Sequence, residues 1–470
     1  MPEQGLPFGN EVPTLNEMSI RFEAGTLVIR GFIPGWLQEA PWVLWDKREL
    51  VFRAEGCRYR DLICLAKENK TPLLDEARQY QKMALSLQTD RVAFPHQRDA
   101  VDHWWSSGAR GLVVLPTGTG KTFVAILAMI RALRSTLVVT PTIDLLNQWR
   151  KELNLAFGVP IGQMGGGEQD LSDISVSTYQ SAHIHLEKWG NRFGLIVFDE
   201  AHHLPGPAFS TSALGSIAPF RLGLTATPEK MEQPLSCYDG LIGPIVYRRE
   251  IPDLSGQYLS NYSTKRIYVD LDPVLRSEYK ACRKAYLDFC TRHQLDMSTE
   301  GAWGRFISLC ARVDGGLAAF RAFRRQKQIP QTNPAKNTVL ESLLKLHARE
   351  RTLIFTVDNA TVYKIAKDLL IPPLTHLTPA KERKILLTGF ASGKFPTLVT
   401  SRVLNEGVDM PLAAVGIVLS GSSTVREHVQ RLGRILRKSG SKHATLYEVI
   451  TRETSEEYAS VRRRDHDAYR

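Results

Sequence analysis

Short apolar runs alternate with amphipathic stretches over most of the chain. Between about residues 90 and 250 the runs are LVVLP, TLVVTP, ISVSTY, LIVFDE and RLGLTAT, with apolar-faced helical segments between them. Near-continuous apolar strands that alternate with helices are typical of a parallel sheet covered on both faces. A second unit of this kind, from about 265 to 455, contains KRIYVDLD, TLIFT, TLVTS, GIVLS and TLYEVI. The pattern predicts an α/β protein with two similar lobes.

Two segments depart from this alternation. Residues 1–85 contain the short alternating runs SIRFEAGTLVIRGF and WVLWDKRELVFR and then a helical RYRDLICLAKEN, which predicts a small α+β domain. Residues 292–335 are rich in arginine and aromatic residues with helical periodicity, which predicts a helical projection. The predicted organisation is an N-terminal domain over 1–85, a lobe over 86–255, and a second lobe over 256–470 that carries this insertion.

The amino-acid composition indicates the kind of partner and the cellular compartment to expect. A formal net charge of +11 and a pI near 9.3 favour a polyanionic partner. No apolar run approaches the roughly 20 residues of a membrane span, and no signal-peptide pattern begins the chain, so we expect a cytoplasmic, nucleoid-associated protein. The six scattered cysteines fit reduced thiols. Cys282, Cys290 and Cys310 lack a fourth ligand nearby, and His202 and His203 lack a third, so we expect neither an iron–sulfur cluster nor zinc.

The segment LPTGTGKT at 115–122 lies between an apolar strand and a helix, which is the context of a phosphate-binding loop. Backbone N–H groups exposed by Gly118 and Gly120 can line a concave nest for phosphate oxygens. Lys121 would neutralise the β- and γ-phosphates, and Thr122 would offer its hydroxyl to magnesium. The predicted nucleotide-binding residues of this loop are Pro116, Thr117, Gly118, Thr119, Gly120, Lys121 and Thr122.

The run LIVFDEAHH places two carboxylates at the carboxyl end of another apolar strand. Asp199 is positioned to hold magnesium through water, and Glu200 to orient or deprotonate the attacking water. The alternative is a surface Asp-Glu pair after a core strand, which the phosphate loop upstream disfavours.

The segment QRLGRILR at 430–437 places Arg434 and Arg437 three residues apart on one face of a predicted helix. Arginines that reach the γ-phosphate from a second lobe supply the positive charge that phosphoryl transfer requires. ATP would then clamp two lobes that hydrolysis releases. The alternative is ordinary surface charge on an amphipathic helix.

These motifs form a series in the order of superfamily-two helicases. The series is Gln97, LPTGTGKT, VTPTIDLLNQW (139–149), VSTYQSA (176–182), DEAH, LTAT (224–227), LIFT (353–356), VTSRVLNEGVDMP (399–411) and QRLGRILR. The chain resembles the archaeal and bacterial XPB-type DNA helicases over nearly its whole length. FDEAHHLP, IAPFRLGLTATPE, VREHVQRLGRILR and IPPLTHLTPAKERKILLTGFASGKF carry the resemblance. RYRDLI is similar to part of that family's damage-recognition domain, and the insertion falls where the family carries its thumb.

The resemblance implies two RecA-like lobes and a DNA helicase that uses ATP and Mg²⁺, tracks 3′ to 5′, and acts in excision repair with a partner nuclease. It also implies roles for further residues. Gln97 would read adenine, Gly407 and Asp409 would contact nucleotide, and Gln430 would lie near the γ-phosphate. His202, Thr225 and Thr227 would couple hydrolysis to lobe movement.

Candidate DNA contacts lie in both lobes. Pro141, Thr142, Thr178, Thr400 and Ser401 follow strands, where hydroxyl and N–H groups can grip backbone phosphates of any sequence. Plain turn and cap chemistry is the alternative for these residues. In the insertion, arginines interleaved with aromatic rings are the candidates for a DNA-gripping surface. They are Arg321, Arg324 and Arg325, among Phe306, Phe320 and Phe323. The alternative is a solvated basic helix that packs its Phe residues inward.

Three departures from the family pattern bear on function. Lys230, Met231 and Glu232 stand where an Arg-Glu-Asp triplet linked to duplex opening often occurs. Phe94 replaces an Arg near Gln97, and Asn405 replaces an Asp. The first departure favours a double-strand translocase that does not separate strands. An ATP-gated clamp that positions a nuclease is a further alternative, whereas an RNA helicase is disfavoured because the match lies with XPB.

Overall fold

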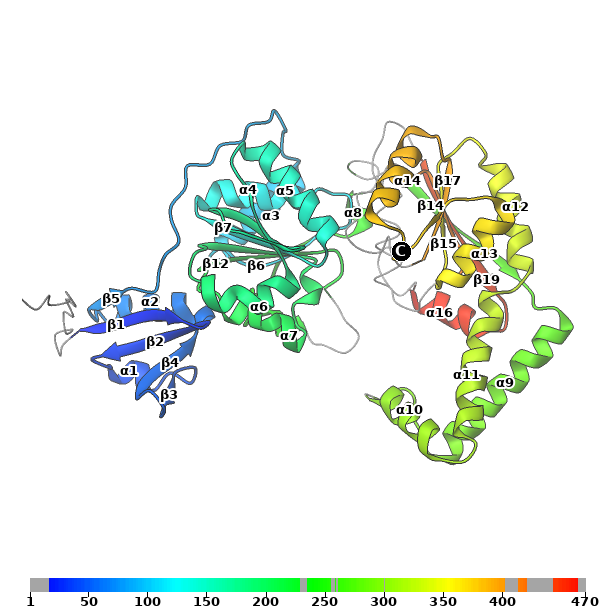
Figure 1. Cartoon of the computed structure of the whole chain (residues 1–470), viewed down its shortest axis with the longest axis horizontal. Coiled ribbons are helices and arrows are strands. Elements are labelled where there is room, and N and C mark those ends of the chain that lie inside the picture. Colours follow the sequence, from blue (N-terminus) through cyan, green and yellow to red (C-terminus); the bar gives the residue numbers. More distant parts are fainter. Residues whose placement is uncertain are drawn as a thin grey trace, which may run out of the picture. The chain divides into compact units, whose positions relative to one another are not determined.

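The computed structural model describes residues 17–228, 235–254, 258, 261–299, 301–401, 413–420 and 443–463. The chain divides into two compact units, one made of the residues up to Val114 and Gly120–Arg248, the other containing the residues from Arg249 onward (Figure 1). Each unit contains a mainly parallel sheet with helices on both faces, and the first unit also carries the N-terminal domain. The predicted α/β class with two lobes is confirmed.

The N-terminal domain is built on a five-stranded sheet of order β3-β4-β2-β1-β5. β1 (Met18–Glu23) and β2 (Thr26–Gly31) form an antiparallel hairpin over the first of the alternating runs. The other elements are α1 (Gly35–Gln38), β3 (Leu44–Asp46), β4 (Val51–Glu55), η1 (Gly56–Arg58), α2 (Tyr59–Glu68) and β5 (Leu73–Asp75). Leu62 of α2 packs on the inward positions of the hairpin, so the predicted α+β domain is confirmed.

Buried contacts join this domain to the first lobe. Ile217 of the lobe is 1% exposed and belongs to the domain's hydrophobic core. Asn191 Nδ2 donates to the Ala77 carbonyl at 2.9 Å. Arg60 donates to the carbonyls of Gly108 and Pro219. The domain therefore shares a hydrophobic core with the lobe and is joined to it by hydrogen bonds from side chains to main-chain carbonyls.

The sheet of the first lobe has eight strands in the order β13-β6-β12-β11-β7-β10-β8-β9. Five parallel strands match the predicted apolar runs: β6 (Arg110–Val114), β7 (Thr136–Thr140), β10 (Ile174–Thr178), β11 (Leu195–Asp199) and β12 (Phe220–Thr225). The sequence pattern missed β8 (Gly162–Gly165), β9 (Glu168–Asp170) and β13 (Ile245–Arg248). β8 and β9 form a short polar hairpin that has no apolar run to reveal it.

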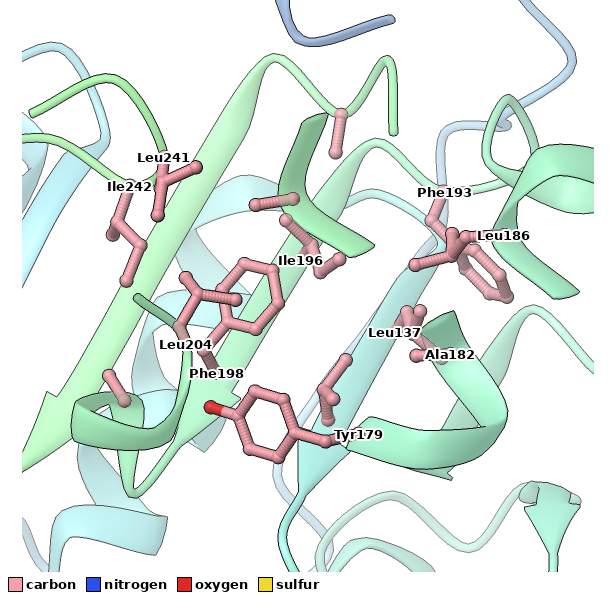
Figure 2. Packing of buried hydrophobic residues seen from close by; sticks show 14 of the residues in the cluster. Leu137, Tyr179, Ala182, Leu186, Phe193, Ile196, Phe198, Leu204, Leu241 and Ile242 are labelled. Carbon is pink, nitrogen blue, oxygen red and sulfur yellow. The ribbon is translucent and has the colours of Figure 1, made fainter. Parts of the chain in front are cut away.

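Helices cover both faces of this sheet. One face carries α6 (Tyr179–Trp189), η2 (Ala201–His203) and α7 (Pro207–Leu214), whose apolar residues pack on Phe198 and its neighbours (Figure 2). Side chains alternate along a strand, so Asp199 points to the opposite face from Phe198. The remaining helices of this unit are α3 (Pro95–Ser106), α4 (Lys121–Ala132), α5 (Ile143–Phe157) and the short η3 (Leu235–Tyr238).

The second unit has six parallel strands in the order β14-β19-β18-β15-β17-β16. They are β14 (Asn261–Val269), β15 (Thr352–Phe355), β16 (Pro373–Leu374), β17 (Thr397–Thr400), β18 (Val415–Val418) and β19 (His443–Thr451). Its helices outside the insertion are α8 (Ile251–Leu254), α12 (Ala335–Leu346), α13 (Asn359–Leu369), α14 (Ala380–Ser392) and α16 (Ser455–Arg463). Ile354, Val399, Ile417 and Val449 lie in its core.

The insertion is a helical projection made of α9 (Pro273–Arg292), α10 (Ala302–Arg312) and α11 (Gly316–Gln331) (Figure 1). It begins earlier than residue 292 because Asp272 caps α9, its carboxylate accepting the N–H groups of Val274 and Leu275 at 2.9 Å each. Phe306 is fully buried, and Phe320 and Phe323 pack against the same core. The interpretation of these rings as DNA-gripping is wrong for Phe306, which has no surface for a base to stack on.

Candidate nucleotide and magnesium site

Three motifs of the first lobe begin at one edge of its sheet. The strand register pairs Val114 of β6 with Thr225 of β12, and Leu224 of β12 with Asp199 of β11. The carboxyl ends of these parallel strands are therefore aligned. Because ligands of α/β proteins bind at the carboxyl ends of parallel strands, this edge is the candidate functional site.

The phosphate-binding loop follows β6 at this edge. Gly118 has φ +90° and Gly120 has φ +85°, left-handed conformations that glycine adopts without steric cost. Gly120 caps the N-terminus of α4, and Lys121 and Thr122 open that helix. Thr117 Oγ1 is buried and has no hydrogen-bond partner among the described residues. A buried hydroxyl without a partner, at a helix N-terminus, fits a bound phosphate group.

Gln97 braces the phosphate-binding loop from α3. Its side chain is 1% exposed, and its Oε1 accepts the N–H of Phe94 at 3.0 Å. Its Nε2 donates to the carbonyl of Gly120 at 3.5 Å. Its predicted role in reading adenine remains a prediction.

Asp199 is held by three hydrogen bonds. The indole N–H of Trp149 donates to Oδ2 at 2.7 Å, and the N–H of Glu200 donates to Oδ1 at 3.0 Å. On the other face of the sheet, the hydroxyl of Tyr179 donates to the Asp199 carbonyl at 3.0 Å. The sequence motifs identify Asp199 but contain no signal that Trp149 contacts it.

Burial and the neighbouring charge of Glu200 raise the pKa of Asp199 to about 6, against the opposing influence of Trp149 and Lys121. A buried carboxylate of this kind fits a divalent cation, whose charge offsets the cost of burying the anion. Carboxylate and hydroxyl oxygens are also the ligands that Mg²⁺ prefers. Asp199 and Thr122 are thus suited to hold Mg²⁺.

Glu200 occupies a strained position. Its φ of +47° is in the left-handed region, which costs a residue with a Cβ roughly 1–2 kcal/mol. Its Oε2 is buried and has no hydrogen-bond partner within the described ranges, although it lies 3.5 Å from Nδ1 of His202. Strain of this kind gathers at functional sites, and an unsatisfied carboxylate oxygen suits a general base for water.

The predicted coupling residues lie together. His202 is fully buried, and its Nδ1 lies 3.0 Å from Oγ1 of Thr225. The same Oγ1 accepts the N–H of Thr227 at 3.2 Å. The contact between His202 and Thr225 therefore links the DEAH tetrad directly to the LTAT motif, and the Thr227 bond ties the two threonines of that motif together.

A hollow of about 470 Å³ lies beyond the ends of β7, β8 and β10. It is lined by Pro141, Ile143, Gly165, Gly166, Gly167, Glu168, Gln169, Thr178, Gln180, Ser181, Ile184 and His185. Thr142 and Thr178 cap the helices that begin here, their hydroxyls accepting the N–H groups of Leu145 and Ser181. Cap chemistry therefore occupies these two hydroxyls. The sequence analysis did not predict the lining residues of the β8–β9 hairpin, because it did not predict the hairpin.

The predicted DNA contacts of the second unit differ in accessibility. Thr400 is fully buried, and Ser401 is 2% exposed and donates to Asn359 Oδ1 at 2.6 Å. Arg321 and Arg324 are exposed on α11. Arg325 forms a bidentate ion pair with Glu278, at 2.6 and 2.9 Å.

Several predicted residues lie outside the described ranges. They are Lys230, Met231, Glu232, Asn405, Gly407, Asp409, Gln430, Arg434 and Arg437. In the part of the chain that the structure describes, no cluster of three or more His, Cys, Asp or Glu side chains could hold a metal ion. No helix found there is long and apolar enough to cross a membrane.

A phosphate-binding loop, a DEAH tetrad and an LTAT motif on one edge of a parallel sheet, followed by a second α/β unit, define a superfamily-two helicase. Comparison with protein families agrees. Residues 20–77 match the Xeroderma pigmentosum group B helicase damage recognition domain, and residues 319–467 match the ERCC3/RAD25/XPB C-terminal helicase. Residues 76–230 match the type III restriction enzyme, res subunit.

Individual relatives narrow the class. The chain is 36% identical to the DNA 3′-5′ translocase XPB2 of Sulfurisphaera tokodaii over 91% of this chain and 96% of that protein. It is 30% identical to the DNA 3′-5′ helicase XPB of Mycobacterium tuberculosis over 78% of this chain and 62% of that longer protein. The Hef helicase domain of Pyrococcus furiosus has the same fold, with a TM-score of 0.54 at 20% identity over 78% of this chain and 97% of that one. The chain belongs to the XPB family of helicases.

Proposed function

We propose that this chain is an ATP-driven motor that moves 3′ to 5′ on DNA and uses Mg²⁺. The observation that carries the proposal is the arrangement at the sheet edge, where Asp199, Glu200 and His202 join the phosphate-binding loop and Thr225. Family membership and the names of the relatives, DNA 3′-5′ translocase and helicase, support it.

Each residue of this edge has a distinct role in the proposed hydrolysis. Lys121 neutralises the β- and γ-phosphates, and Glu200 orients the attacking water and accepts its proton. Asp199 and Thr122 hold Mg²⁺, which supplies positive charge to the phosphate oxygens when bound. The hydrogen bond between His202 and Thr225 would connect this chemistry to the LTAT segment, within which Thr227 donates to Thr225.

DNA would lie over the hollow beside Pro141 and Thr178. The hollow receives the N-termini of α5 and α6 and the backbone of Gly165–Gly167. Helix N-termini and main-chain N–H groups bind phosphate without reading base sequence. The expected binding is therefore independent of sequence and weakens steeply with salt.

A duplex translocase that does not separate strands is the second candidate. Lys230, Met231 and Glu232 replace the triplet linked to duplex opening, and the Sulfurisphaera relative is named a translocase. In either case we propose a place in nucleotide excision repair beside a partner nuclease, in the cytoplasm on the nucleoid. In this proposal the partner nuclease makes the cut in the DNA.

Strand displacement on tailed duplexes tests the proposal. The motor should displace a strand from a 3′-tailed duplex and not from a 5′-tailed duplex, with Mg²⁺-ATP required. A translocase would displace a triplex-forming third strand while leaving the duplex intact. Failure on both substrates, with DNA binding preserved, would refute the motor and favour an ATP-gated clamp.

A further inference from the structure

The indole of Trp149 is buried against the DEAH aspartate. Trp149 is 1% exposed, and its N–H donates to Asp199 Oδ2 at 2.7 Å. The other carboxylate oxygen accepts the N–H of Glu200. With one donor on each oxygen, the carboxylate cannot turn about its Cβ–Cγ bond without breaking a charge-assisted hydrogen bond. Trp149 therefore sets the direction in which Asp199 presents its remaining lone pairs.

The helix that carries Trp149 begins at the hollow. Thr142 caps α5, and Ile143, its first residue, lines the hollow. Trp149 follows Thr142 by about two helical turns, or about 10 Å along the helix axis. One rigid element therefore spans from the candidate DNA surface to the candidate Mg²⁺ ligand.

Arg150, the next residue along α5, connects back to the hollow. Its Nη1 donates to Gln163 Oε1 at 2.5 Å, and Gln163 Nε2 donates to the carbonyl of Gly165, a lining residue, at 2.9 Å. Gln163 is 9% exposed, so this chain of bonds is partly shielded from water. The adjacent residues Trp149 and Arg150 of α5 thus contact Asp199 and, through Gln163, the β8–β9 hairpin at Gly165.

We propose that Trp149 is a positioning residue through which DNA in the hollow controls the affinity of the Asp199 site for Mg²⁺-nucleotide. DNA that contacts the hairpin and the start of α5 shifts the helix, and the Trp149 hydrogen bond carries the shift to the Asp199 carboxylate. By linkage, Mg²⁺-nucleotide raises the affinity for DNA by the same factor. The inference rests on the proposed function, because it requires DNA in the hollow.

Trp149→Phe removes the N–H and keeps an aromatic ring in the same place. Trp104→Phe is a matched control, because Trp104 is also fully buried and donates its indole N–H, at 2.8 Å, to the Arg221 carbonyl away from the site. Both variants lose one buried hydrogen bond and similar packing. A difference between them therefore reports on the position of the indole.

The experiment measures the equilibrium binding of a fluorescent, non-hydrolysable ATP analogue to the full chain, with Mg²⁺ or with EDTA, and with or without a short duplex DNA. In wild type and Trp104→Phe, DNA should tighten Mg²⁺-dependent binding by at least about fivefold. Trp149→Phe should weaken Mg²⁺-dependent binding about tenfold, leave binding in EDTA within about twofold, and lose most of the DNA effect.

A second variant, Gln163→Leu, tests the same connection in case Trp149→Phe does not fold. Gln163→Leu leaves the Trp149–Asp199 bond in place and removes the connection from Arg150 to Gly165. It should keep Mg²⁺-dependent binding without DNA and lose most of the DNA effect. The melting temperature of each variant, measured alongside, shows whether the fold is intact.

The outcomes separate the two proposals. If Trp149→Phe retains both Mg²⁺-dependent binding and the full DNA effect, like Trp104→Phe, the role of Trp149 is refuted while the motor stands. If wild type itself shows neither DNA binding nor a DNA effect, the proposed function fails at its DNA step, and the control of the site by DNA fails with it.

Discussion

The sequence predicts functional residues at the sheet edge of the first lobe and in the helical insertion. The two sites differ in how far the sequence pattern determines where those residues lie in the fold. At the edge, the strand register aligns Val114 with Thr225, and Leu224 with Asp199. In the insertion, helical periodicity leaves two opposite faces to choose from, and Phe306 takes the inward one. A residue at the carboxyl end of a parallel strand lies at one edge of the sheet, so its position follows from the sequence pattern. A residue within an amphipathic helix can face the core or the solvent, and packing decides which of the two it faces.

The largest expected effect lies at the edge. Lys121→Ala should lower the rate of ATP hydrolysis by at least about a thousandfold, because the positive charge on the β- and γ-phosphates is lost in the transition state. DNA binding at low salt should stay within about twofold of wild type, since the hollow is untouched. Turnover by phosphate release, together with DNA binding by anisotropy, checks both expectations. Near-normal hydrolysis would show that the nucleotide binds elsewhere.

In the insertion the largest effect should fall on stability. Phe306 packs among Tyr286, Phe289, Trp303 and Phe323 with ring centroids 5.5–6.0 Å away. Phe306→Ala should therefore destabilise the insertion by about 3–5 kcal/mol. Limited proteolysis at α9–α11 would report this loss.

The control for this prediction is Leu317→Ala, because Leu317 is 57% exposed on α11. It should change stability by less than about 0.5 kcal/mol. Equal proteolysis of wild type and Phe306→Ala would contradict the inward packing and restore a surface role for that ring.

The exposed arginines of α11 should have a moderate effect. Arg321→Ala and Arg324→Ala should each lower DNA affinity uniformly across sequences, and each should reduce the magnitude of the salt slope by about 1. Anisotropy titrations over a range of salt concentrations provide the measurement. An unchanged slope in the double variant would place the DNA contact away from this helix.

The smallest effect should come from the paired arginine. Arg325 is bound by Glu278, so Arg325→Ala should change DNA affinity less than Arg321→Ala does. Glu278→Ala frees the guanidinium and removes a negative charge, so it should raise DNA affinity slightly at low salt. A loss of affinity in Arg325→Ala that matches the loss in Arg321→Ala would show that the ion pair opens for DNA.

The same difference between strands and helices explains which parts of the structure can be predicted from the sequence. Each apolar strand that was predicted is present, and the residues after them, including Asp199 and Thr178, lie at strand ends as expected. The polar hairpin β8–β9 was missed because Gly, Gln and Glu carry no alternating pattern. The start of α9 was missed because few of its residues are buried, although Asp272-Pro273 is a recognisable helix start.

The contact of Trp149 is the clearest example of a feature that the sequence does not predict. Trp149 ends the motif VTPTIDLLNQW, and nothing in the spacing of that motif indicates a contact with Asp199. Its hydrogen bond to Asp199 depends on how α5 lies on the sheet, and that placement follows from tertiary packing rather than from the helix's own periodicity. Roles that arise from contacts between elements cannot be derived from the spacing within one element.

Steady-state ATP hydrolysis by wild type and by Glu200→Gln, with and without duplex DNA, would test whether this sheet edge drives a DNA motor. DNA should stimulate hydrolysis by wild type, and Glu200→Gln should lose turnover by several orders of magnitude while it still binds nucleotide and DNA. Hydrolysis that ignores DNA, or that survives in Glu200→Gln, would contradict an ATP-driven DNA motor built on this sheet edge.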